Sequence, residues 1–169
     1  MSISFVRSFF FRVALLMLLL SRLAYAQPVT YTASQAHSHN DYEQSSPFLF
    51  AFKEQFGSIE ADIHLVNGVL LVGHDARDLK PSRTLEELYL KPISQLIDTG
   101  RRLQLLIDVK TAAIPTLDAL VILLRKYPAI INSSTIKVVI SGNRPEPDHY
   151  ADYPDFIWFD GRLEISYTP

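Results

Sequence analysis

The chain has 169 residues, no cysteine, and 16 Lys and Arg against 18 Asp and Glu, which gives a formal net charge of −2 at pH 7. The absence of cysteine excludes a disulfide framework, so the core alone must hold the fold. The acidic balance argues against a nucleic-acid partner.

The first 26 residues are typical of an export signal. Arginines border an apolar run from Val13 to Leu20, and Ala24-Tyr25-Ala26 supplies small residues for cleavage. The alternative is a membrane anchor, but a spanning helix needs ~20 apolar residues. We therefore predict a signal over residues 1–26 and an exported mature chain, periplasmic or secreted, with no stable membrane span. Removal of the signal leaves 13 basic and 18 acidic residues, a net charge of −5.

Strand-like and helix-like segments alternate along residues 27–169, which we treat as one domain. Turn and capping residues and hydrophobic periodicity delimit the first half. We expect a short strand ending in Ala36-His37-Ser38-His39, a helix from Ser45-Ser46-Pro47 to Phe56 closed by Gly57, a strand over Ser58 to Val66, and an Asn67-Gly68 hairpin turn into Val69 to Val72.

The second half continues the same alternation. We expect a helix from Thr84 to about Asp98 that Pro92 bends or splits, a strand over Leu103 to Lys110, a helix through Leu117 and Leu124 that Pro128 ends, and strands at Ile136 to Ile140 and Phe156 to Phe159. Alternating strands and helices with short links predict an α/β fold with a parallel sheet. Residues that perform chemistry gather at the carboxyl ends of such strands.

Three acidic residues are the strongest candidate site. Glu60 and Asp62 share one face of a predicted strand, and Asp108 ends the next strand. Clustered carboxylates are unfavourable unless a cation neutralises them, and oxygen ligands suit Mg²⁺ or Ca²⁺. The alternative is that Lys110 or arginines merely pair with these acids.

Two histidines and two further polar residues complete the predicted site. His39 and His74 are candidates for proton transfer near neutral pH, and Lys110 and Asn40 for contacts with a phosphate. In a regular hairpin His74 would lie opposite Ala61, on the wrong face. The prediction therefore requires a break in the register at Gly73.

Several motifs resemble a known family. "IEADIHLVNGVLLVGHD" followed by "SRTLEEL" resembles the core motif of the glycerophosphodiester phosphodiesterases, within the phosphatidylinositol phospholipase C-like phosphodiesterase superfamily. "SIEADI" and "LLIDVKT" are also similar to the sphingomyelinase D branch. "HSHNDY", "SGNRP" and "FDGRL" are most similar to bacterial relatives of the altered inheritance of mitochondria proteins.

The resemblance covers residues 36–163 and implies a (β/α)₈ barrel of the TIM type. It implies Glu60, Asp62 and Asp108 as ligands of one Mg²⁺ or Ca²⁺, with the roles given above for the two histidines, Asn40 and Lys110. The implied activity is hydrolysis of a small-molecule or lipid phosphodiester, of the glycerophosphodiester or (lyso)phospholipid type. Asn40-Asp41 stands where the commoner pattern has Arg-Gly, so the choice of substrate is not carried over.

Two other functions remain open. A complete barrel takes ~250 residues and we expect about five strand-helix units, so the chain is predicted to be an incomplete barrel and could be an inactive phosphate-binding remnant. His37-Ser38-His39 could instead bind zinc, as in amidohydrolases or histidinol-phosphatase-like enzymes. Such sites need several further histidines, and only His149 follows His74.

Overall fold

The computed structural model describes residues 30–96 and 100–161. The chain divides into two units, Met1–Thr32 and Ala33–Pro169, and the second contains every element discussed below. The predicted export signal lies outside the described residues. Within the described ranges, no helix is long and apolar enough to cross a membrane.

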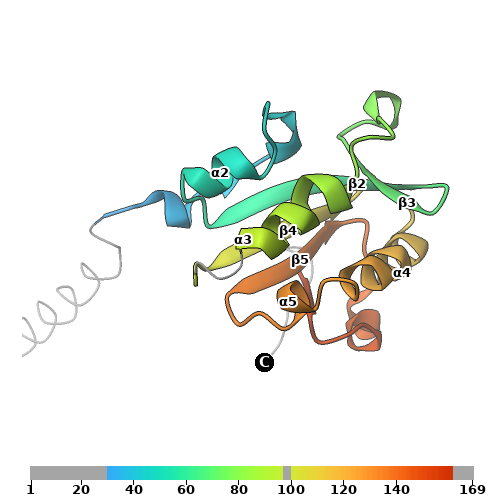
Figure 1. Cartoon of the computed structure of the whole chain (residues 1–169). Coiled ribbons are helices and arrows are strands. Elements are labelled where there is room, and N and C mark those ends of the chain that lie inside the picture. The colour runs from blue at the N-terminus through green and yellow to red at the C-terminus, as the bar shows by residue number, and fades with distance from the viewer. Residues whose placement is uncertain (1–29, 97–99, 162–169) are drawn as a thin grey trace, which may run out of the picture. The chain divides into compact units, whose positions relative to one another are not determined.

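The second unit is built on one six-stranded sheet (Figure 1). The strands are β1 (His37–Ser38), β2 (Ser58–Val66), β3 (Val69–Val72), β4 (Leu103–Val109), β5 (Ile136–Gly142) and β6 (Ile157–Phe159). Five of them run parallel in the order β1-β2-β4-β5-β6, and β3 pairs antiparallel with β2. The predicted α/β fold with a largely parallel sheet is therefore confirmed.

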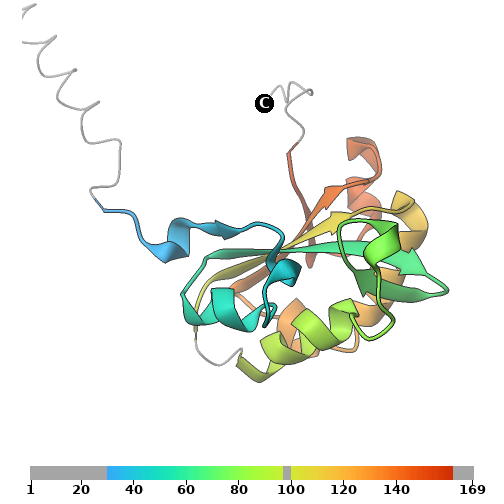
Figure 2. The ribbon, with the colours of Figure 1, turned by 90° about the horizontal axis from the view of Figure 1, so that it is seen from above.

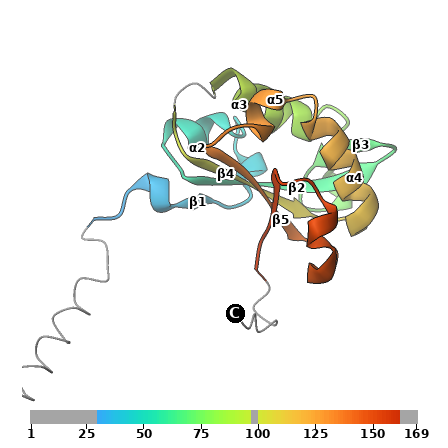
Figure 3. The ribbon, with the colours of Figure 1, turned by 90° about the horizontal axis from the view of Figure 1, so that it is seen from below.

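Helices cover one face of this sheet. They are α2 (Leu49–Lys53), α3 (Lys91–Leu96), α4 (Ala113–Leu124) and α5 (Pro128–Ile131). Views from above and from below both show α3, α4 and α5 on the same side of the strands (Figures 2 and 3). The short helical turns are η1 (Ala33–Gln35), η2 (Asp41–Glu43), η3 (Ala76–Asp78), the π-helix η4 (Glu86–Leu90) and η6 (Pro147–Asp152).

The alternation of side chains along the strands separates the core from the other face. Buried apolar residues of β2 and β4 pair in register and pack with helix residues such as Leu117 and Leu120; the strand residues are Ile59, Ala61, Ile63, Leu105, Ile107 and Val109. Between them on β4, Leu106 and Asp108 face away from this core and are only half-buried, whereas Glu60 and Asp62 on the same face of β2 are buried. The second face is therefore less covered than the helix face within the described residues.

Helix α2 is much shorter than the sequence predicted. It begins at Leu49 because Phe48 has a positive φ of 63° and donates its backbone N–H to the buried carboxylate of Asp41. The predicted cap at Ser45-Ser46-Pro47 is therefore wrong. Gly57 does not have the left-handed conformation of a helix-closing glycine; a side chain there would overlap the carbonyl of Ser34.

Pro92 divides the next predicted helix, as expected. The π-helix η4 precedes α3, and a proline ring crowds the carbonyl four residues before it, which the wider π turn relieves. Asp98, the predicted helix end, lies outside the described residues. The helix over the next connection ends at Leu124, and Pro128 begins α5 as its first residue.

Replacing Ile107 should destabilise the fold more than replacing Leu106. We expect Ile107→Ala to lower the free energy of unfolding by ~2–5 kcal/mol, because a cavity opens between sheet and helices. Leu106→Ala should lower it by under about 2 kcal/mol, because Leu106 is only half-buried on the other face. Urea unfolding of the 169-residue chain measures both, and equal losses would contradict the assignment of faces.

Candidate functional site

Three carboxylates meet on the sheet face opposite the helices. Asp62 and Asp108 are direct neighbours in the parallel register of β2 and β4, and Glu60 precedes Asp62 by two residues on the same face. One carboxylate oxygen from each residue lies within 4.8 Å of the others. Glu60 is 5 % exposed and Asp62 is 0 % exposed. The site therefore concentrates negative charge where water cannot fully solvate it.

Lys110 partly neutralises this cluster. Its Nζ lies 3.0 Å from Asp62 Oδ2 and 3.3 Å from Asp108 Oδ1. Burial alone would lower the pKa of the Lys110 ammonium, but the hydrogen bonds and charges of these two carboxylates outweigh burial and raise the pKa. The pairing that the sequence analysis left open therefore exists. Within the described residues, this is the one lysine or arginine paired with the three acids.

The two oxygens of Asp62 have different surroundings. Oδ2 accepts hydrogen bonds from the Tyr42 hydroxyl at 2.8 Å, from His74 Nδ1 at 3.0 Å and from Lys110 Nζ at 3.0 Å. Oδ1 is buried and has no hydrogen-bond partner in the described part of the chain. A buried carboxylate oxygen without a partner is unfavourable and calls for a cation. Glu60, Asp62 and Asp108 therefore fit a hard divalent cation with oxygen ligands.

The end of β1 brings His39 and Asn40 to the cluster. Because Ser38 pairs with Ile59, the chain leaves β1 beside Glu60. His39 Nε2 lies 4.0 Å from Glu60 Oε2, and 72 % of the His39 side chain is exposed. Asn40 has a left-handed backbone with φ 49°, and its Oδ1 accepts a hydrogen bond from the Tyr42 hydroxyl. Asparagine adopts this conformation more readily than most residues.

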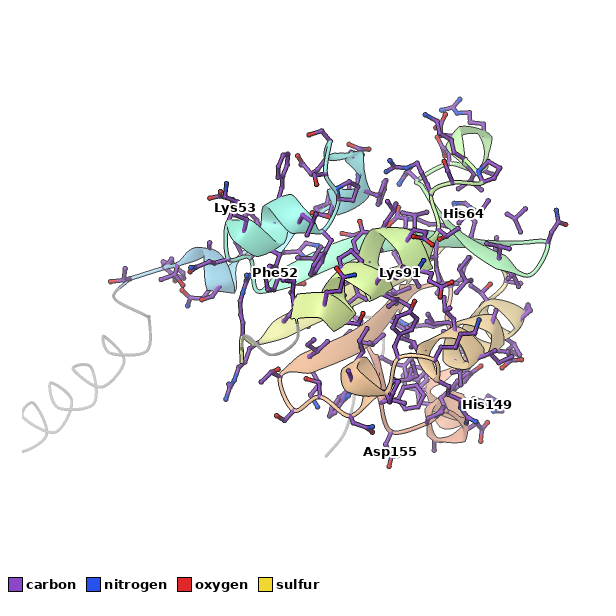
Figure 4. All side chains as sticks on the ribbon, in the orientation of Figure 1. Phe52, Lys53, His64, Lys91, His149 and Asp155 are labelled. Atoms are coloured by element: carbon purple, nitrogen blue, oxygen red, sulfur yellow. The ribbon has the colours of Figure 1, made fainter. Side chains whose placement is uncertain are left out.

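His74 reaches the cluster because the hairpin ends before it. Strand β3 stops at Val72, and the Gly73 N–H donates to the Asp62 carbonyl. The ring of His64, at the far end of β2 (Figure 4), donates Nε2–H to the carbonyls of Gly73 and His74. These contacts stabilise the break in the strand register at Gly73 that the sequence predicts. The His74 ring can then place Nδ1 against Asp62.

All seven predicted site residues lie around this cluster, although their roles stay predictions. Asn40 joins it through Tyr42, and the other six lie within 4.0 Å of another member. Tyr42 was missed. It lies in the irregular turn η2, where neither strand nor helix periodicity assigns a side chain to a face. Its place in the stretch His39-Asn40-Asp41-Tyr42 was the available signal.

Asp41 fixes the turn η2 through its hydrogen bonds. It is fully buried and accepts hydrogen bonds from the Ser38 hydroxyl at 3.0 Å, the Phe48 backbone N–H and the Tyr89 hydroxyl at 3.1 Å. Burial, with the hydrogen bond and charge of a neighbouring carboxylate, raises the pKa of Tyr89 beside Asp41 and of Tyr42 beside Asp62. Both hydroxyls therefore keep their protons and act as donors at neutral pH.

His37 is a second residue whose position the sequence did not predict. Its Nε2 lies 2.8 Å from Glu60 Oε2, and its Nδ1 lies 2.8 Å from Ser58 Oγ. Ser58 Oγ accepts a hydrogen bond from Gln104 Nε2 at 3.2 Å. Because a carboxylate only accepts, Nε2 carries a proton. The sequence indicates His37 only as a possible zinc ligand together with His39, and the two ring centroids lie 6.3 Å apart.

The last residue of β5 and the residue after it support the end of β4. Gly142 has a φ of +68°, and a side chain there would overlap Asp108 Oδ1 and the backbone of Val109. Asn143 donates its side-chain amide to the carbonyls of Lys110 and Thr111, both at 3.2 Å. The short Gly142-Asn143 stretch therefore leaves room for Asp108 and fixes the backbone of Lys110.

A known family matches the part of the chain that contains the cluster. The sequence model of the AIM6-like phosphodiesterase domain matches residues 28–114, which include all seven predicted site residues. No solved structure matches the chain significantly.

Three fungal proteins are similar to part of the chain. They are the altered inheritance of mitochondria protein 6 homolog of Arthroderma benhamiae, 40 % identical over 67 residues, and the altered inheritance of mitochondria protein 6 of Eremothecium gossypii, 41 % over 66, and of Kluyveromyces lactis, 38 % over 65. These matches cover 36 %, 38 % and 37 % of this chain and 21 %, 17 % and 16 % of the relatives. The chain thus matches about a fifth of the length of these relatives.

Gly142→Ala should lower the free energy of unfolding more than Gly68→Ala does. A methyl group at residue 142 overlaps Asp108 and backbone atoms of Val109, whereas at Gly68, with φ +79°, it meets nothing within 4 Å. Both changes carry the strain of a positive φ, so Gly68→Ala is the control. We expect Gly142→Ala to lose ~1–3 kcal/mol more stability in urea unfolding. Equal losses would contradict the close approach of Gly142 and Asp108.

Proposed function

Because the chain belongs to the AIM6-like phosphodiesterase domain family, we propose that it is a phosphoric diester hydrolase that depends on one divalent cation. The observation that carries the proposal is the buried Asp62 Oδ1, which has no hydrogen-bond partner in the described residues and lies among three carboxylates with a single lysine. A diester substrate brings further negative charge to this site. A bound cation would resolve both problems.

Glu60, Asp62 and Asp108 would hold the cation, Mg²⁺ or Ca²⁺. The bound ion would stabilise charge that develops on the phosphoryl oxygens. An all-oxygen ligand set supports this choice over zinc. His37 would orient Glu60 as a metal ligand, because its protonated Nε2 donates a hydrogen bond to Glu60 Oε2.

Protons would move through His39 and His74. The hydrogen bond from His74 Nδ1 to Asp62 fixes the tautomer of the neutral ring, so that Nε2 carries the free lone pair. His74 could therefore take a proton at Nε2 while Asp62 stabilises the resulting charge. His39, which is largely exposed beside Glu60, would serve as the partner that donates a proton to the leaving group.

Lys110 and Asn40 would contact the phosphate. The raised pKa keeps the Lys110 ammonium charged at neutral pH, so it can bind a phosphoryl oxygen as a point charge. Asn40 turns its Oδ1 toward Tyr42, and its amide nitrogen has no acceptor among the described residues. That nitrogen is a free donor for a second phosphoryl oxygen.

We also propose the wider context that the resemblance implies. The substrate would be a glycerophosphodiester or a (lyso)phospholipid-type diester, met outside the cytoplasm after export. The sheet would form part of a (β/α)₈ barrel. Support comes from an apolar row on the less covered face, where Leu106 and Val139 pair in register with each other and Trp158, 50 % exposed, pairs with Val139. A barrel interior would bury such a row.

Substitutions in two carboxylate–histidine pairs, one inside the site and one outside it, test the catalytic roles. His74 lies 3.0 Å from Asp62 in the site, and His149 lies 3.0 Å from Asp152 outside it. We expect His39→Ala and His74→Ala each to lower kcat for glycerophosphocholine ~10²–10⁴-fold, and Asp62→Asn to do the same. His149→Ala and Asp152→Asn should leave kcat unchanged. Full activity in His39→Ala or Asp62→Asn would refute the proposal.

Removal of metal tests the cation separately. We expect a chelator to abolish hydrolysis and Mg²⁺ or Ca²⁺ to restore it, because the three proposed ligands offer oxygen atoms. Full activity in the chelator would exclude a metal-dependent mechanism. Restoration by Zn²⁺ alone, lost in His37→Ala, would instead support the His-x-His alternative. Binding of inorganic phosphate without turnover of any diester would support the inactive remnant.

A further inference from the structure

We infer that Tyr42 is a positioning residue whose single hydroxyl holds Asp62 with Oδ1 toward the cation and Asn40 with its amide nitrogen toward the phosphate. The inference rests on the proposed function and adds to it the group that orients one proposed metal ligand and one proposed phosphate contact. Tyr42 belongs to neither set of ligands itself.

The two oxygens of Asp62 have different hydrogen-bond partners and so can serve different roles. A carboxylate group can rotate, so either oxygen of Asp62 could face the cation. Three donors converge on Oδ2, and Oδ1 has none in the described part of the chain. The hydrogen bonds therefore select the orientation before a cation arrives, which lowers the cost of binding it.

Tyr42 differs from the other two donors to Asp62, Lys110 and His74, in that it has no other proposed role in the reaction. Lys110 also pairs with Asp108, and a bound phosphate would compete for its ammonium. His74 is 58 % exposed and is proposed to move a proton during the reaction. The Tyr42 hydroxyl is neutral and nearly buried, since Tyr42 is 4 % exposed. It is therefore the donor that can hold Asp62 through the whole reaction.

The Tyr42 hydroxyl also contacts Asn40. The same hydroxyl lies 2.8 Å from Asn40 Oδ1 and 2.8 Å from Asp62 Oδ2, and it shares its single proton between the two oxygens in a three-centre hydrogen bond. A side-chain amide has one oxygen and one nitrogen on opposite sides, so contact of Oδ1 with a donor turns the nitrogen away. That nitrogen meets no acceptor among the described residues. One hydroxyl thus orients both groups.

Tyr42 is held independently of both groups. The Arg83 guanidinium donates to the Tyr42 carbonyl, and the preceding residue, Asp41, accepts hydrogen bonds from Ser38, Phe48 and Tyr89. The turn is fixed by contacts outside the cluster, so the hydroxyl has a defined position without a cation or substrate. This independence distinguishes a positioning residue from one that follows its ligand.

Titration with Mg²⁺ alone tests the Asp62 half. Tyr42→Phe removes only the hydroxyl, and we expect it to raise the Mg²⁺ dissociation constant about 10-fold in calorimetry without substrate, as loss of a group behind a metal ligand does. Tyr127→Phe is the matched control, because its hydroxyl also donates to a carboxylate, Glu86, at 2.8 Å. Wild-type Mg²⁺ affinity in Tyr42→Phe would overturn the inference and leave the proposed function standing.

Inorganic phosphate at saturating Mg²⁺ tests the Asn40 half. We expect Tyr42→Phe to weaken phosphate binding several-fold in the native chain and to have no further effect in an Asn40→Gly background, because the two residues act through one contact. Glycine is chosen at residue 40 for its tolerance of the positive φ. Independent losses that add in the double variant would overturn this half.

A second variant and the wild type complete the test. Should Tyr42→Phe fail to fold, Asn40→Gly alone should weaken phosphate binding and keep the Mg²⁺ isotherm, because the hydroxyl then donates to Asp62 only; weaker Mg²⁺ binding in Asn40→Gly would overturn the inference. Wild-type protein that binds no Mg²⁺ or Ca²⁺ would overturn the proposed function, and the inference with it.

Discussion

The burial of Asp62 between two other carboxylates is the constraint on which the rest of the site depends. A fully buried carboxylate is stable only if its charge is compensated and its oxygens are hydrogen-bonded. Here Lys110 supplies one positive charge, and three donors satisfy one oxygen. The remaining negative charge, and the oxygen without a partner among the described residues, are the features on which the proposed cation site rests.

The parallel register turns sequence spacing into this cluster. Asp62 and Asp108 are 46 positions apart in the chain but direct neighbours in the sheet, because β4 pairs with β2 from Ser58 to Ile63. Adjacent strands place such pairs about 5 Å apart, close enough to repel. The end of the neighbouring strand β5 must then leave room for the Asp108 side chain. Gly142 does so, since a side chain there would displace Asp108.

The sequence predicted the regular parts of the molecule and failed where one buried side chain redirected the backbone. The bounds of β2 and β3 were predicted correctly, because strict alternation and the Asn67-Gly68 turn are local signals. The start of α2 was wrong because Asp41 binds the N–H of Phe48, a contact that no periodicity encodes. Gly57 was misread for a similar reason: it allows a close approach by Ser34, which is distant in sequence.

The same distinction applies to the site. The three acids could be predicted, since they follow from alternation on one strand and the end of the next. The position of His74 could be stated only as a condition on Gly73, because it depends on how His64 holds the carbonyls after the hairpin. Tyr42 could not be placed from an irregular turn. The charged residues of the cluster were thus visible in the sequence, whereas the neutral donor Tyr42 and the buried Asp41 beside it were not.

That asymmetry has a physical cause. The three acids lie on adjacent strands, whose register brings them together beside Lys110, and a buried charge without such compensation is strongly destabilising. A neutral hydroxyl can be supplied from any segment that reaches the same point, because burying it carries little penalty once it is hydrogen-bonded. In this chain that segment is the turn η2, which Asp41 fixes because its carboxylate accepts hydrogen bonds from donors in β1, at the start of α2 and in η4. Contacts on the covered side of the sheet thereby decide how the acids on the open side are presented.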